Sequence, residues 1–168
     1  MNRRPFHEMP QPFLTRQAQA GERLTCGGCV EFRRDPADRR HWKLYHPIDP
    51  GANTLGLFVA HDKDRTHYAA GEIASYIQVF GILRFNAILR AGERVYGEQY
   101  RRGRTSCGGT PLVSAGDGTG ALVPASRFVN ADRICGYAIA DLDLSEAEED
   151  QLIEIQTEIY TGAIAEVG

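Results

Sequence analysis

The stretch that decides the fold is GILRFNAILRAGERVYG, residues 81–97. One side of a period-two alternation carries the apolar residues Leu83, Phe85, Ala87 and Leu89, and the other carries Arg84, Asn86 and Arg90. Such alternation predicts a strand with one buried face. Ala91-Gly92-Glu93 then predicts a turn, after which residues 94–96 resume an extended pattern.

Length and composition predict a globular β-rich protein. The chain has 168 residues, of which 42% are hydrophobic and 24% charged, as in ordinary soluble domains. Its 18 glycines and 8 prolines favour many turns and short strands over long helices. The net charge of −3 gives no general attraction to nucleic acid. No secretory signal and no membrane-spanning run is present in the sequence, so we expect synthesis in a cytoplasm.

Further strand candidates occur on both sides of the central stretch. The expected strands lie at residues 30–33, 42–45, 55–61, 72–80 and 133–143, and a hairpin is expected around Asp117-Gly118-Thr119-Gly120. Together they predict a mainly β fold, arranged as a sheet meander or a sandwich. The glycine-rich turn does not follow the order strand, GxGxxG, helix, and no Walker lysine is present. A nucleotide-binding loop is therefore disfavoured.

The segment QLIEIQTEIY, residues 151–160, fits two structures. Ile153, Ile155 and Ile159 alternate as a strand requires, whereas Leu152, Ile155 and Ile159 also fit one face of a helix. Ser145 and Glu148 would form a capping box for that helix. The isoleucine and threonine content favours a strand.

The chain divides into an arm and a domain. Residues 1–20 are predicted to form an extended N-terminal arm, because three prolines interrupt regular hydrogen bonding there, at positions 5, 10 and 12. Phe6, Phe13 and Leu14 are candidate partner-binding anchors, and a solvated tail is the alternative. Residues 21–168 form one β-rich domain, in which residues 22–70 are a possible inserted lobe.

Four cysteines are the candidate metal ligands: Cys26, Cys29, Cys107 and Cys135. Cys26-Gly-Gly-Cys29 is a CxxC turn that would supply half of a tetrahedral structural zinc site, and the other two residues would complete it. Two alternatives stay open. The thiols are unrelated and free, or Cys26 and Cys29 form a redox pair. A redox pair usually opens a helix, whereas a strand is expected here.

No other pattern indicates catalysis. The sequence has no GxSxG motif and no recognisable nucleophile–base pair. His41 and His46 lack ligand spacing and are expected on loops or the sheet surface. The acidic residues between 141 and 150 lack the central glycine of a calcium loop. The basic residues 101–104 are expected to be a solvated loop.

From about residue 71 onward the sequence resembles small phage capsid decoration (cement) proteins. The segments that carry the resemblance are YIQVFG at 76–81, AGERVY at 91–96, LVPA at 122–125, RICGYAIAD at 133–141 and LIEI at 152–155. Residues 22–70, with the CxxC turn and Trp42, lie outside the shared pattern.

The resemblance implies a small β-barrel or β-tulip domain. It also implies a non-enzymatic virion protein on the capsid surface, assembled in the host cytoplasm. It implies binding to the major capsid protein lattice, association as a trimer, an N-terminal arm that bridges capsomers, and no direct contact with nucleic acid or membrane. Two other classes remain as alternatives: a small zinc- or thiol-dependent protein, such as a redox enzyme, and a β-rich adaptor module.

Overall fold

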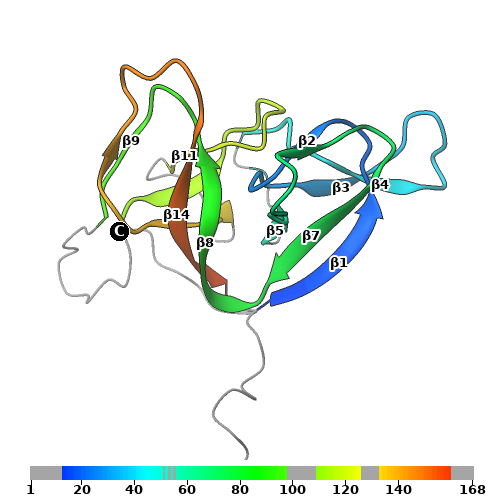
Figure 1. Ribbon diagram of the computed structural model, residues 1–168, viewed down its shortest axis with the longest axis horizontal. Coiled ribbons are helices and arrows are strands. Elements are labelled where there is room, and N and C mark those ends of the chain that lie inside the picture. Colours follow the sequence, from blue (N-terminus) through cyan, green and yellow to red (C-terminus); the bar gives the residue numbers. More distant parts are fainter. Residues whose placement is uncertain are drawn as a thin grey trace, which may run out of the picture.

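The computed structural model describes residues 13–50, 52, 54, 56–97, 109–125 and 133–159. Within these ranges the chain forms strands and no α-helix (Figure 1). No helix in this part of the chain is long and apolar enough to cross a membrane. The predicted mainly β fold is confirmed.

Five strands close into a barrel. In spatial order they are β10 (Pro111–Ser114), β11 (Leu122–Pro124), β8 (Gly81–Leu89), β14 (Gln151–Ile159) and β12 (Gly136–Ala138). β8 and β14 pair antiparallel along their full lengths, from Gln151 opposite Leu89 to Ile159 opposite Gly81. The strand interpretation of residues 151–160 is therefore confirmed. The expected hairpin around residues 117–120 joins β10 to β11.

The alternation predicted for residues 83–89 places side chains inside the barrel. Ala87 and Leu89 are fully buried, and Leu83 and Phe85 pack against the same core. Phe85 meets Phe58 edge to face, with ring centroids 4.7 Å apart. Ala91 and Gly92 form the expected turn after β8. It is followed by the short ribbon of β9 (Arg94–Val95) and β13 (Leu142–Asp143).

A second lobe lies beside the barrel (Figure 1). Its largest sheet has the order β1 (Phe13–Gln19), β7 (Ile73–Val79), β5 (Leu57–Val59), with antiparallel pairing throughout. Two ribbons complete the lobe: β2 (Leu24–Thr25) with β6 (His67–Tyr68), and β3 (Glu31–Arg34) with β4 (Trp42–Tyr45). This lobe contains most of the predicted insertion 22–70. The domain boundaries themselves stay a prediction.

The sheet β1–β7–β5 separates two clusters of buried side chains. Along β7, Ala74 and Tyr76 belong to the cluster of the N-terminal lobe, whereas Val79 belongs to the barrel cluster. Along β5, Phe58 faces the barrel cluster and Val59 the other. Because successive side chains of a strand point to opposite faces, each of these strands contributes to both cores. The two lobes therefore share one wall.

The predicted arm requires a correction. Residues 13–19, which were expected to extend away from the domain, form β1 and pair with β7 at seven consecutive positions. Residues 1–12, which include Phe6, lie outside the described residues. Sequence alone does not reveal β1, because the strand with which it pairs, β7, begins only at Ile73, far along the chain.

Candidate functional site

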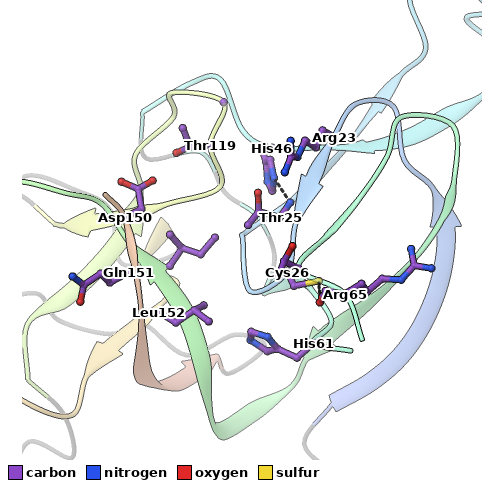
Figure 2. A pocket seen from close by; sticks show the side chains of 13 residues that line it. Arg23, Thr25, Cys26, His46, His61, Arg65, Thr119, Asp150, Gln151 and Leu152 are labelled. Atoms are coloured by element: carbon purple, nitrogen blue, oxygen red, sulfur yellow. Dashed lines mark hydrogen bonds between the residues drawn. The ribbon is translucent and has the colours of Figure 1, made fainter. Parts of the chain in front are cut away.

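A cleft of about 540 Å³ lies between the N-terminal lobe and the barrel (Figure 2). We call it the interlobe cleft. Most of its lining residues are polar, and Ile88 and Leu152 contribute apolar side chains. The residues that line it are Arg23, Thr25, Cys26, His46, His61, Arg65, Thr66, Ile88, Gly118, Thr119, Asp150, Gln151 and Leu152.

His46 is a buried residue that lines this cleft. Its side chain is only 2% exposed, so its expected position on a loop or sheet surface is wrong. Nδ1 lies 2.8 Å from the carbonyl oxygen of Cys29, and Nε2 accepts a hydrogen bond from the backbone N–H of Thr25 at 3.0 Å. Because a carbonyl only accepts, Nδ1 carries the proton and the ring is neutral. Both ring nitrogens are satisfied.

Glycines on two sides allow the His46 ring to fit. A Cβ atom at Gly28 would lie 2.7 Å from Cε1 of His46, and a Cβ atom at Gly120 would lie 2.4 Å from Nδ1. Gly28 belongs to the CxxC turn and Gly120 to the β10–β11 hairpin. The backbone N–H of Cys29 also donates to the carbonyl of Gly120 at 3.0 Å. The CxxC glycines thus have a packing role that their spacing does not reveal.

Burial also sets the protonation of His46. Removal from solvent lowers the pKa of this imidazole below its ordinary value, and this effect exceeds the opposing influence of the Cys29 carbonyl and of Glu22. The folded protein therefore holds the neutral form on which both hydrogen bonds depend.

Two of the ionic groups around the cleft, Arg65 and Asp150, already have partners. Arg65 donates to Glu72 at 2.8 Å and stacks over Tyr68, and its guanidinium points away from the cleft in Figure 2. Asp150 accepts a hydrogen bond from the backbone N–H of Ala91 at 2.9 Å. These groups brace loops. Among the described lining residues, none forms a nucleophile–base pair.

The predicted cysteine ligands are only partly brought together. Cys29 and Cys135 are buried in the barrel cluster, whereas Cys26 is buried in the cluster of the N-terminal lobe. The thiol of Cys26 points to the carbonyl of Arg65, and that of Cys29 to the carbonyl of Gly120. The side chains of Cys26 and Cys29, although they belong to one CxxC turn, therefore lie in different buried clusters.

This arrangement does not supply a metal site from the described residues. No group of three or more His, Cys, Asp or Glu residues among them could hold a metal ion. Cys107, the remaining predicted ligand, lies outside the described residues. The structural zinc therefore stays a prediction.

Burial affects the reactivity of the thiols in the same direction at all three described positions. Desolvation raises the pKa values of Cys26, Cys29 and Cys135 above the ordinary value, and the negative charge of a neighbouring Cys135 thiolate would add to the effect at Cys29. Redox and nucleophilic cysteines need the opposite, a lowered pKa and an accessible thiolate. These three residues have the character of buried structural cysteines.

The two candidate partner-binding residues that the structure describes, Phe13 and Leu14, lie at one end of the molecule. Phe13 pairs with Val79 at the end of β7, and Leu14 is 43% exposed beside it. The chain turns there from β7 into β8. Phe80, between the two strands, is 47% exposed, and Ile82 on β8 is 52% exposed. We call Leu14, Phe80 and Ile82 the apolar tip. The corner between β7 and β8 lies at the lower end of Figure 1. The prediction of apolar anchors missed Phe80 and Ile82. The sequence signal was the pattern Phe80-Gly81-Ile82, two large apolar residues on either side of a glycine.

Comparisons with known proteins establish a shared fold. No protein-family model matches the sequence, and no curated protein matches it. The structure is similar to the crystal structure of the N base of head fiber gp8.5 from bacteriophage phi29, with a TM-score of 0.51 at 14% sequence identity. The similarity covers 89% of this chain and 99% of that one, so it extends over both the barrel and the N-terminal lobe.

Replacing Gly120 by Ala will destabilise the protein more than replacing Gly118 by Ala. Both glycines have positive φ, 77° and 81°, so both variants carry a similar backbone strain. Only the Gly120 variant places a Cβ against His46, because nothing lies within 4 Å at Gly118. We expect a difference of about 1–3 kcal/mol in the free energy of unfolding, measured with urea. Equal losses would show that the ring has room to move.

Stability will fall as the pH drops below about 6.5, the ordinary pKa of histidine. In the unfolded chain His46 takes up a proton there, whereas the folded protein keeps it neutral, because its folded pKa is lowered. The unfolded state then binds more protons and gains up to about 1.4 kcal/mol per pH unit. His46→Gln keeps a donor and an acceptor but does not titrate. Urea unfolding between pH 7 and pH 5 should give a smaller slope for this variant, and equal slopes would contradict the assignment.

Proposed function

We propose that this chain is a structural protein of a phage virion that binds the outer surface of the capsid. The observation that carries the proposal is the shared fold with the phi29 head fiber base, which extends over nearly all of both chains. The resemblance to capsid decoration proteins from about residue 71 onward supports the same class of protein. The partner in this proposal is the major capsid protein.

The chemistry of the described residues supports a binding role. Arg65 and Asp150, two ionic groups that line the interlobe cleft, already have partners, and the thiol of Cys26, another lining residue, has a raised pKa. A small redox enzyme would need an accessible thiolate with a resolving partner. Cys26 and Cys29 instead lie in separate cores.

In this proposal the apolar tip is the surface that docks on the capsid. Leu14, Phe80 and Ile82 expose large apolar side chains at one end of the molecule. Residues 1–12, with the predicted anchor Phe6, directly precede β1 in the sequence, so we expect the arm and the tip to act on one partner. Each such contact is modest, and repetition over a symmetric lattice multiplies its strength. The tip is accordingly the surface that faces the capsid.

Phe80→Asp and Ile82→Asp will each weaken capsid binding. A charge at either position prevents the burial of an apolar side chain, which we expect to lower the affinity roughly 10–100-fold. The measurement is co-sedimentation of the purified chain with capsids assembled from the major capsid protein of the same genome.

Ile73→Asp is the matched control. Ile73 is 59% exposed on β7, at the end opposite to the tip, and this variant should bind as the unchanged chain does. Circular dichroism verifies that all three variants fold. A chain that fails to sediment with capsids would refute the proposed function, and equal binding by the tip variants would refute the assignment of the surface.

A further inference from the structure

A second cavity, of about 580 Å³, lies between the shared wall and β8. We call it the wall groove. β7 and β8 diverge from their common corner, and residues of both strands line the groove together with residues of β1 and of the segment that follows β5 (Figure 1). Its volume falls within the range of about 300–1,000 Å³ that is typical of ligand-binding cavities. His61 lines both this groove and the interlobe cleft.

The register of the shared wall directs side chains into this groove. Phe13 and Thr15 of β1 lie opposite Val79 and Ile77 of β7. Paired residues of an antiparallel ladder point to the same face, so Thr15 and Ile77 share the face that lines the groove. Thr15 is exposed, and a larger side chain at this position would extend into the groove.

Part of the groove lining is apolar and incompletely covered. Its half-buried apolar residues are Phe13, Ile77, Leu83 and Phe85. Ile77, Leu83 and Phe85 pack against the barrel cluster, so the core covers one side of each. The remaining surface of these side chains borders the groove, and its removal from water would be favourable. The groove is therefore suited to a large apolar side chain.

Among the described residues, no carboxylate forms an ion pair with either of two cations that line the groove, Lys63 and Arg84. Both side chains are exposed. Nε of Arg84 donates to the neutral side chain of Gln156 at 2.9 Å. Asp62, an acidic residue of the same lining, lies 3.7 Å from Nε of Arg65. The groove is therefore suited to an occupant that carries a negative charge.

The groove begins at the end of the molecule that carries the apolar tip. Phe13 adjoins Leu14 on β1, and Leu83 adjoins Ile82 on β8. Successive side chains of a strand point to opposite faces, so the tip and the groove lie on opposite sides of the same strand ends. A partner that covers the tip is therefore within reach of the groove. This continuity favours one partner for both surfaces.

We propose that the wall groove receives an extended segment of the major capsid protein, which inserts a large apolar side chain and places a carboxylate beside Lys63 and Arg84. This site rests on the proposed function, because its ligand belongs to the same partner. The tip then contributes an exposed apolar contact, and the groove contributes selectivity through its shape and charge.

A variant that fills the groove tests this site. Thr15→Trp places a large side chain in the groove and should lower the affinity for capsids at least about 10-fold in the co-sedimentation assay. Thr66→Trp is the matched control, because Thr66 is an exposed residue of the interlobe cleft, and it should bind as the unchanged chain does. Circular dichroism verifies that both variants fold. If Thr15→Trp binds like the unchanged chain while Phe80→Asp binds more weakly, the groove is refuted and the proposed function stands.

A reversed charge tests the chemistry of the occupant. Lys63 lies between β5 and β6, outside the strands, so Lys63→Glu leaves the sheet intact. This variant should bind capsids about 3–10-fold more weakly, and the loss should shrink at high salt, because salt screens exposed ion pairs. Arg39→Glu makes the same change of charge in the turn between β3 and β4 and should have no effect. Equal binding by Lys63→Glu and the unchanged chain would refute the carboxylate.

Two other outcomes would overturn the proposal in different ways. Analytical ultracentrifugation measures whether the chain associates with itself. Self-association of the unchanged chain that is absent in Thr15→Trp would assign the groove to a second copy. An unchanged chain that fails to sediment with capsids would overturn both this site and the proposed function.

Discussion

The rest of the structure depends on the buried imidazole of His46, which contacts both lobes. His46 accepts from the N–H of Thr25 and donates to the carbonyl of Cys29, and its ring fits between Gly28 and Gly120. It therefore joins a loop of the N-terminal lobe to a hairpin of the barrel. Removing either hydrogen bond would leave a buried polar group unsatisfied, which is costly in an apolar environment. This contact fixes the back of the interlobe cleft.

The shared wall β1–β7–β5 is a second connection between the two lobes. Because β7 and β5 contribute side chains to both buried clusters, neither core is complete without the strand that also completes the other. The apolar tip begins on this wall, with Leu14 on β1 and Phe80 directly after β7, so a rigid element presents it. Surfaces held in this way lose little conformational entropy when they bind a partner.

Local patterns predicted the barrel better than the lobe. The alternation in residues 81–89, the turn at Gly92 and the strand at residues 151–159 could be predicted because period-two burial is visible within each segment. β1 was missed because its partner is distant in sequence and most of its side chains are exposed. The burial of His46 and the separation of Cys26 from Cys29 are tertiary properties. A CxxC spacing predicts a tight turn. It does not predict to which face of the sheet each sulfur points.

The long ladder between β8 and β14 also sets the order of folding. About 60 residues separate the two strands, and β14 completes the barrel beside β8. Until residues 151–159 leave the ribosome, one edge of β8 has no partner. Closure of such a distant pair is slow, because the entropy of the intervening loop must be lost first. Synthesis of this chain thus has a window in which chaperone capture competes with aggregation.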